Sequence, residues 1–199
     1  MFTGIIFTMG KLVALEKKKE PCLILKTDGL AGIKIGDSIA VNGACLTVIE
    51  TDRDDLKFNL SHETLLRSNF ADLIPGSYVN IELPLTLKDL LSGHLVSGHL
   101  DGVVRVKTIQ KKLASTKFSF VYQDKNWKKF LIPKGSVALN GISLTLLEVK
   151  SSFFSVEVIP HTLKTTNMKY LKIGERVNLE LDLIGKYLYN LSQSKGDLY

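Results

Sequence analysis

The stretch SIAVNGACLTVIE, residues 38–50, decides the fold of this chain. It contains two runs in which apolar residues recur at every second position, separated by Asn42-Gly43. Asn-Gly is the strongest short-range hairpin signal, because both residues tolerate the positive φ angles of a two-residue turn. The stretch therefore predicts a β-hairpin.

Nearly the same phrase, SVALNGISLTLLE, returns at residues 136–148, and its Asn140 lies 98 positions after Asn42. A period this long predicts two copies of one domain rather than a solenoid, whose repeats are roughly 20–50 residues long. We place the first domain at 1–96 and the second at 97–184. The same spacing joins further pairs: Thr64 and Thr162, Gly76 and Gly174, Asn80 and Asn178, Glu82 and Glu180, and Gly4-Ile5 and Gly102-Val103.

Each copy has the pattern of an antiparallel β domain. Alternating apolar runs predict strands in both halves, and one short helix per copy is expected after SHETL (61–65) and PHTL (160–163). Closure into a barrel is the expected architecture, because it removes exposed strand edges. The further strands are expected at 56–60, 78–83, 118–122, 153–159 and 176–183.

The end of the chain has a different periodicity. Leu183, Ile184, Tyr187, Leu188 and Leu191 follow the spacing of one face of a helix. We therefore expect a C-terminal helix, assigned to residues 185–199, whose apolar face covers a core or a partner.

Composition narrows the class of protein. The 199 residues are 45% apolar, which suits an ordinary globular protein, and the net charge of +6 comes mostly from scattered lysines, a pattern that does not favour nucleic-acid binding. Two cysteines without a CxxC pair indicate a reducing compartment and no metal site. The first residues lack the pattern of a signal peptide, and no run approaches the roughly 20 apolar residues of a membrane helix, so we expect a cytoplasmic protein.

Strand alternation predicts where chemistry is possible. Cys45 and Thr47 share one face of their strand, and Ser143 and Thr145 share the corresponding face in the second copy. Such a polar pair beside an apolar face suits a planar heterocycle with hydrogen-bonding edges. The alternative is that Cys45 is a small buried hydrophobe and Thr47 an ordinary exposed threonine.

Three further features leave alternatives open. His94 and His99, in SGHLVSGHL (92–100), are spaced for opposite faces of a strand, which argues against a shared metal. Either imidazole is a candidate general base or a hydrogen-bonding group at the domain crossing. Thr64 and Thr162 are candidate helix N-caps, or they mark helix starts that hold a ligand.

Five motifs in order resemble riboflavin synthases of the trimeric, two-barrel, lumazine-binding type: MFTGI (1–5), NGACLTV (42–48), SGHLVSGHLDG (92–102), NGISLT (140–145) and IPHTLKTTN (159–167). The resemblance implies an all-β fold with two six-stranded Greek-key barrels in tandem and a C-terminal α-helix. It implies a transferase that converts two 6,7-dimethyl-8-ribityllumazine molecules to riboflavin and 5-amino-6-ribitylaminouracil by moving a four-carbon unit. No cofactor and no metal are expected.

The resemblance also implies the site. It forms between the first barrel of one subunit and the second barrel of its neighbour in a homotrimer, with the C-terminal helix as trimer contact. Cys45 is expected to polarise or transiently add to the acceptor lumazine, and His99 to transfer a proton, with Ser143, Thr145 and Asp182 as positioning or relay groups. Ser38 is a further expected catalytic residue. First-copy substrate contacts are expected at Phe2, Gly4, Ile5, Ile6, Ser38, Cys45, Leu46, Thr47, Asn59, Leu60, Ser61, His62, Glu63 and Thr64. The second-copy contacts are expected at Gly98, His99, Leu100, Lys134, Ser143, Leu144, Thr145, Glu157, Val158, Ile159, Pro160, His161 and Thr162.

Association with lumazine synthase is a further partner expectation. The competing interpretation is a carrier that binds lumazine or flavin on the same double barrel without catalysis. Because both copies keep a threonine-bearing polar face and the TL helix start, the sequence favours the enzyme.

Overall fold

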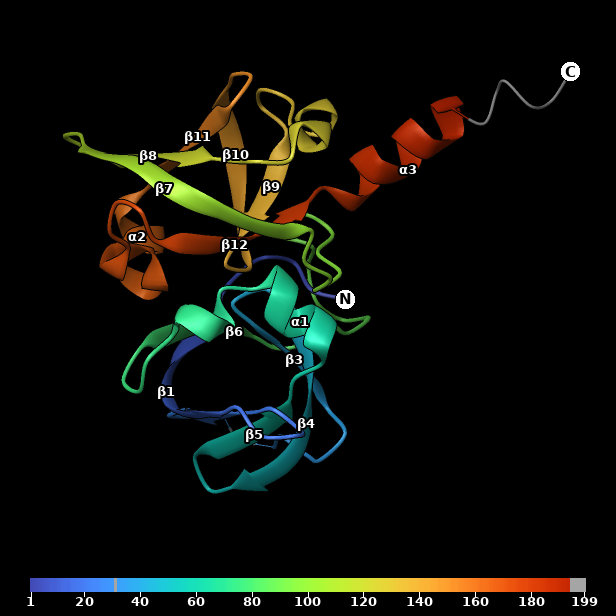
Figure 1. The fold of residues 1–199 in the computed structure, drawn as a ribbon, viewed down its shortest axis with the longest axis vertical. Coiled ribbons are helices and arrows are strands. Elements are labelled where there is room, and N and C mark those ends of the chain that lie inside the picture. The colour runs from blue at the N-terminus through green and yellow to red at the C-terminus, as the bar shows by residue number, and fades with distance from the viewer. Residues whose placement is uncertain (31, 194–199) are drawn as a thin grey trace, which may run out of the picture.

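The computed structural model describes residues 1–30 and 32–193 and contains two closed antiparallel barrels, the second lying above the first in Figure 1. Both barrels have six strands and the same strand order, so the predicted all-β tandem fold is confirmed. In the first, the order around the barrel is β1-β2-β5-β4-β3-β6, and the second repeats it as β7-β8-β11-β10-β9-β12.

The elements of the first barrel are β1 (Thr8–Glu16), β2 (Cys22–Lys26), β3 (Ser38–Val41), β4 (Ala44–Asp52), β5 (Asp55–Asn59), α1 (His62–Arg67), η1 (Phe70–Asp72) and β6 (Tyr78–Glu82). Those of the second are β7 (Gly102–Lys111), β8 (Thr116–Val121), η2 (Lys125–Lys129), β9 (Ser136–Leu139), β10 (Ile142–Val149), β11 (Phe153–Val158), α2 (Pro160–Thr165), η3 (Asn167–Tyr170) and β12 (Arg176–Leu181). The last element is α3 (Leu183–Gln193). The sequence did not predict β1, β2 or β7.

The repeat spacing of 98 does not extend to the first strand of each barrel. Thr8 of β1 pairs with Ile81, whereas Gly102 of β7 pairs with Leu179, the counterpart of Ile81. Thr8 therefore corresponds to Gly102, and Gly4 corresponds to Gly98. Joining Gly4-Ile5 to Gly102-Val103 was wrong, because the loops between the first and third strands differ in length in the two copies.

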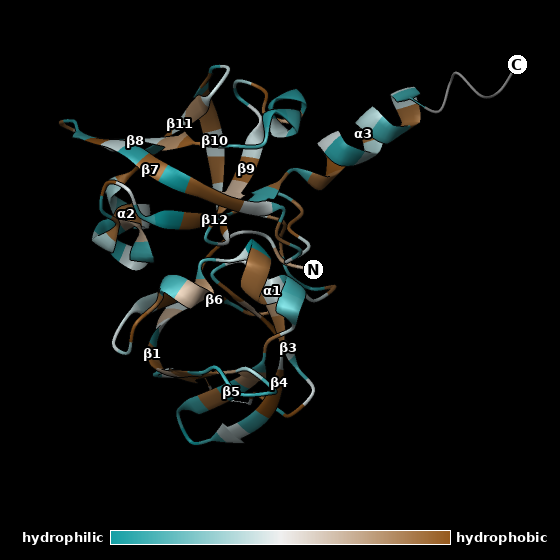
Figure 2. Cartoon of the chain, viewed as in Figure 1, coloured by the Kyte–Doolittle hydropathy of each residue, from teal (hydrophilic) through white to brown (hydrophobic). Residues whose placement is uncertain are grey.

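Each barrel has its own apolar core, made by the inward side chains of its strands. In the first barrel Leu23, Ile39, Val48 and Phe58 are fully buried. The second barrel adds aromatic packing, with Phe120 close to Phe154. Figure 2 shows the hydrophobic residues alternating with hydrophilic ones along these strands.

The two Asn-Gly turns meet between the barrels. Asn42 and Asn140 have φ angles of 44° and 45°, which confirms the predicted hairpins. A Cβ on Gly43 would lie 2.7 Å from the backbone nitrogen of Gly141, so the turns pack back to back. The close approach requires glycine at both positions, because a β-carbon has no space there.

Buried asparagines connect these turns to the opposite barrel. The amide of Asn80 donates to the Asn140 carbonyl, and the amide of Asn178 donates to the Asn42 carbonyl, both at 2.9 Å. Two further asparagines extend the network: the backbone N–H of Asn69 donates to Asn178 Oδ1, and that of Asn167 donates to Asn80 Oδ1. Since all of these residues are buried, the network fixes how one barrel docks on the other.

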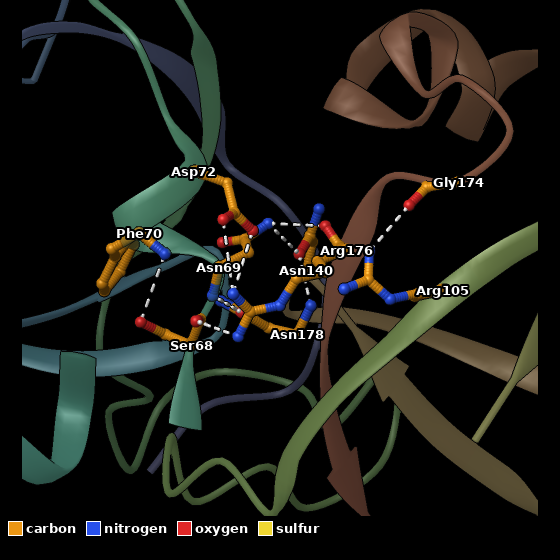
Figure 3. A network of polar contacts seen from close by, with 9 residues as sticks. All are labelled: Ser68, Asn69, Phe70, Asp72, Arg105, Asn140, Gly174, Arg176 and Asn178. Atoms are coloured by element: carbon orange, nitrogen blue, oxygen red, sulfur yellow. Dashed lines mark hydrogen bonds and ion pairs between the residues drawn. The ribbon is translucent and has the colours of Figure 1, made fainter. Parts of the chain in front are cut away.

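Two more contacts between the barrels lie at positions related by the repeat, and they differ in kind. Tyr78 stacks on Tyr170 with ring centroids 4.8 Å apart. At the positions related by the repeat, Arg176 forms an ion pair with Asp72 at 3.2 Å (Figure 3). Two further contacts, one aromatic and one ionic, therefore join the barrels beside the asparagine network.

Helix α3 extends away from the second barrel (Figure 1). Its apolar residues Ile184, Tyr187, Leu188 and Leu191 are between 53% and 64% exposed. The helix begins at Leu183, two residues before the predicted start, and the predicted segment 194–199 lies outside the described residues. No helix in the described part of the chain has the length and apolar character needed to cross a membrane.

Candidate active site

The predicted polar faces lie on β4 and β10. Along β4, Ala44, Leu46 and Val48 are buried, whereas Cys45 is half-buried and Thr47 exposed. Along β10, Ser143 and Thr145 have the same exposure between the buried residues Ile142, Leu144 and Leu146. The alternation is confirmed in both copies, and Cys45 is not a fully buried core residue.

Each polar face is completed by a segment that precedes the first strand of the other barrel. The backbone N–H of Ser143, in the second barrel, donates to the Gly4 carbonyl at 2.8 Å. The backbone N–H of Cys45, in the first barrel, donates to the Gly98 carbonyl at 2.9 Å.

The apolar residues next to these glycines cross over in the same way. Ile6 packs against the core of the second barrel, and Leu100 packs against the core of the first. The sequence-based grouping of Gly4, Ile5 and Ile6 with Cys45 was therefore wrong. Segment 4–6 belongs to the Ser143 face, and segment 98–100 belongs to the Cys45 face.

His94 makes a side-chain hydrogen bond to the Ser143 face. Nδ1 of His94 lies 2.7 Å from Oγ of Ser143, and the backbone N–H of His94 donates to the Thr3 carbonyl. Burial lowers the pKa of His94 below its ordinary value, and the charge of nearby Asp182 acts in the opposite direction. A neutral imidazole beside a hydroxyl can accept a proton, so this pair is a candidate base.

From the sequence, His94 is a candidate base or hydrogen-bonding group but not one of the expected site residues. The resemblance selected His99, whose side chain is exposed and whose backbone N–H donates to the Ser97 hydroxyl at 3.1 Å. The sequence makes the two histidines equal candidates, because SGHL occurs twice in succession. Their different surroundings could not be predicted, because they depend on which face each segment reaches.

Several predicted contact residues have side chains inside the cores. Phe2 is fully buried between the barrels with Ala40, Val96 and Ala138, and Cys45 packs against this cluster, so Phe2 is not at a rim. At four other positions only the backbone can face a ligand, because the side chain belongs to a barrel core: Leu46, Leu60, Leu144 and Val158.

The helix starts differ from the predicted N-caps. Ser61 caps α1, with its hydroxyl accepting from the Thr64 N–H at 3.0 Å, so Thr64 is inside the helix. Thr162 likewise lies inside α2, which begins with Pro160 after Ile159. Both helices include the TL motif rather than following it, because Ser61 and Pro160 start them earlier.

Ser38 and Lys134 are not equivalent positions. Ser38 pairs with Thr47 across β3 and β4, and Ser136 pairs with Thr145 across β9 and β10. Ser136 is therefore the second-barrel counterpart of Ser38, and the spacing of 98 could have identified it. Lys134 corresponds to Gly36 and has an exposed side chain.

The remaining predicted residues lie at the start of each short helix. In the first copy Asn59, Ser61, His62 and Glu63 are exposed, and Asn59 accepts from the thiol of Cys22. In the second copy Ile159, Pro160 and His161 are exposed. Glu157 pairs with Lys112 at 2.8 Å, and its hydrogen bonds to Lys112 and Ser115 lower its pKa.

The described residues contain no group of His, Cys, Asp or Glu arranged to hold a metal ion. The side chains at the two faces offer hydrogen bonding, the Cys45 thiol, and the His94 imidazole beside the Ser143 hydroxyl. The two faces share the same pattern of exposed and buried residues. They differ at the equivalent positions 45 and 143, where one has a thiol and the other a hydroxyl.

Comparison with known proteins agrees with this duplicated arrangement. The model of the lumazine binding domain matches the chain twice, at residues 3–84 and 97–182. Riboflavin synthase of Actinobacillus pleuropneumoniae is 38% identical over 94% of this chain and 88% of its own length. The riboflavin synthases of Escherichia coli (38%; 92% and 87%) and Saccharomyces cerevisiae (36%; 94% and 84%) are similarly close. The chain belongs to the riboflavin synthase family of tandem lumazine-binding barrels.

Solved structures show the same fold. The structure of LumP complexed with riboflavin has a TM-score of 0.84 at 23% identity, and covers 91% of this chain and 99% of its own. LumP complexed with 6,7-dimethyl-8-(1'-D-ribityl) lumazine has a TM-score of 0.82 with the same identity and coverage.

Proposed function

We propose that this chain is a riboflavin synthase that takes two molecules of 6,7-dimethyl-8-ribityllumazine. A four-carbon unit passes from the donor lumazine to the acceptor, giving riboflavin and 5-amino-6-ribitylaminouracil. The observation that carries the proposal is the pair of equivalent polar faces with unequal reactive groups, Cys45 and Ser143. Two copies of one substrate fit two copies of one face, and unequal groups let the two molecules play different roles.

The residues next to each face support a division of labour. One lumazine must lose a proton from its C7 methyl group so that this carbon can form a bond to a ring carbon of the other, and we assign that molecule to the Ser143 face, where His94 supplies a base. The other lumazine is assigned to the Cys45 face, where the thiol polarises the ring by hydrogen bonding or adds to it. Ser38 and Thr47 on one face, and Thr145 on the other, position the rings. His99 and Asp182 remain proposed for proton transfer and relay.

Holding the two rings together supplies a large part of the acceleration. Orienting two reactants in one site is worth up to roughly 7–11 kcal/mol of the barrier. A single chain exposes Thr47 and Thr145 to solvent, and an enclosed site needs a second surface.

We therefore propose a homotrimer, in which the first barrel of one subunit faces the second barrel of the next. The exposed apolar face of α3 supports the trimer contact. The domain boundaries 1–96, 97–184 and 185–199, the transferase class, a cytoplasmic location and association with lumazine synthase belong to the same proposal.

One incubation separates the enzyme from a carrier. The purified protein is mixed with 6,7-dimethyl-8-ribityllumazine alone, and riboflavin is followed by fluorescence and chromatography. Riboflavin that accumulates over many turnovers supports the synthase. Tight ligand binding without product would support the carrier, and the absence of both would contradict both functions.

A further inference from the structure

Two buried glutamates have no part in the chemistry proposed above. Glu82 at the end of β6 is 5% exposed, and Glu180 in β12 is 2% exposed. Burial raises the pKa of each carboxyl group, and hydrogen bonds from backbone N–H groups oppose that change. A buried carboxylate is expensive unless its oxygens accept hydrogen bonds, so the donors to these groups indicate what they do.

The two carboxylates hold equivalent segments with the same geometry. Oε1 of Glu82 accepts from the backbone N–H of Thr3 at 2.6 Å and from its hydroxyl at 2.7 Å, and Oε2 accepts from the Gly4 N–H at 3.0 Å. Glu180 accepts from the N–H and hydroxyl of Ser97 and from the Gly98 N–H at the same three distances.

These segments are the ones that cross to the other barrel. Gly4 and Gly98 have φ angles of 77° and 83°, which turn each segment sharply after the carboxylate. A Cβ on Gly4 would lie 2.6 Å from Cβ of Ser143, and a Cβ on Gly98 would lie 2.5 Å from Cβ of Cys45. The position of each segment is thus fixed on one side by a glutamate and on the other by the strand that carries the reactive residue.

We propose that Glu82 and Glu180 are positioning residues, each of which holds the segment that completes the substrate face of the opposite barrel. Glu82, in the first barrel, places Thr3 and Gly4 against the Ser143 face of the second. Glu180, in the second barrel, places Ser97 and Gly98 against the Cys45 face of the first. The role in catalysis rests on the proposed function, whereas the crossed structural coupling does not.

Ionised carboxylate oxygens suit this role better than an amide. Both oxygens of each glutamate accept hydrogen bonds, and the donors are N–H or O–H groups. In a Glu→Gln variant, one oxygen is replaced by an NH₂ group that must face an N–H donor. The variant keeps the size of the side chain and loses the hydrogen bonds that one of the two oxygens accepts.

The test compares Glu82→Gln with Glu180→Gln, and uses Glu50→Gln and Glu148→Gln as controls. The control positions are also related by the repeat spacing, and their side chains form ion pairs at the surface. Cysteine labelled with ¹⁵N gives two amide signals, from Cys22 and Cys45, because the chain has two cysteines. The ¹⁵N-labelled imidazole of His94 reports on the other face.

Each glutamate substitution is expected to change the substrate face of the opposite barrel. Glu180→Gln should shift the Cys45 amide signal and speed its hydrogen exchange, while the Cys22 signal and the His94 titration stay unchanged. Glu82→Gln should change the titration of His94, whose N–H donates to the Thr3 carbonyl, and leave the Cys45 signal in place. In turnover assays, each variant should lose about a hundredfold in kcat, the loss expected from a displacement of about 1 Å at a reacting group. The controls should match the wild type.

Two results would overturn the proposal: signals that stay at wild-type positions, or a change confined to the barrel that carries the substitution. If a Gln variant does not fold, Ser97→Ala and Thr3→Val remove the hydroxyl that donates to the glutamate and accepts from the N–H two residues on, keep the two backbone contacts, and should give the same crossed pattern with smaller shifts. The spectra are recorded without substrate. A crossed pattern in a protein that makes no riboflavin would therefore refute the proposed function and leave the structural coupling intact.

Discussion

Gly43→Ala should destabilise this protein through the contact between its two barrels. Gly43 has a φ angle of 81°, and a Cβ there would lie 2.7 Å and 2.9 Å from backbone atoms of Gly141. Gly174 has a similar φ angle of 90°, and a Cβ there would meet nothing within 4 Å. The two alanine variants therefore share the conformational cost and differ in the steric one.

The magnitudes follow from these two contributions. An alanine held at positive φ costs about 1–2 kcal/mol, which both variants should show. Overpacking against a backbone that cannot move aside adds about 1–3 kcal/mol in Gly43→Ala. For a chain of this size, each kcal/mol lowers Tm by about 2–4 °C.

Thermal unfolding followed by circular dichroism measures the difference directly. Gly43→Ala should unfold at a clearly lower temperature than Gly174→Ala. Gly141→Ala should behave like Gly43→Ala, because its Cβ would lie 2.8 Å from the Gly43 nitrogen. Equal losses in all three variants would refute the inference that the back-to-back turns fix the docking of the barrels.

Three other predictions concern the site, the interface and the assembly. Because burial lowers the pKa of His94, the folded state favours the neutral imidazole. The free energy of unfolding, measured with urea, should therefore fall as the pH drops from the ordinary histidine pKa through the lowered one. His94→Gln should flatten that part of the pH profile. Asn80→Ala should reduce the free energy of unfolding by at least about 2 kcal/mol, since it leaves the Asn140 carbonyl and the Asn167 N–H buried without partners; an unchanged urea midpoint would contradict this. Leu188→Lys, on the exposed face of α3, should leave Tm of the isolated chain unchanged and shift sedimentation from trimer to monomer; a trimer that persists would remove α3 from the contact.

Most of the fold could be predicted from local patterns. The Asn-Gly turns and the alternation around Cys45 and Ser143 depend on nearby residues, and the structure confirms them. The spacing of 98 comes from the repeat itself, and it holds from the third strand of each barrel onward. Strands β1, β2 and β7 were missed because their apolar residues do not alternate long enough, or are interrupted by lysine and glycine. The correspondence of Gly4 with Gly98 was missed, because Gly4-Ile5 also resembles Gly102-Val103 at the spacing of 98 that holds elsewhere.

The arrangement of the site was harder to predict, because it depends on contacts distant in the sequence. Nothing local shows that segment 4–6 crosses to Ser143 or that Gly98 reaches Cys45. The same is true of His94, which lies near Ser143 only because the chain between the barrels folds back along Thr3. Sequence patterns predicted which residues are polar and accessible, and the fold decided which of them meet.

The central claim is that two molecules of one substrate react across the two faces, and an isotope experiment tests it most directly. The protein is given an equal mixture of unlabelled lumazine and lumazine with ¹³C in C6, C7 and both methyl groups, and the riboflavin is analysed by mass spectrometry. If the four-carbon unit passes between two lumazines, a quarter of the riboflavin should be unlabelled, half should carry one labelled unit and a quarter should carry two. Riboflavin with only the unlabelled and fully labelled masses, or no riboflavin at all, would contradict the account.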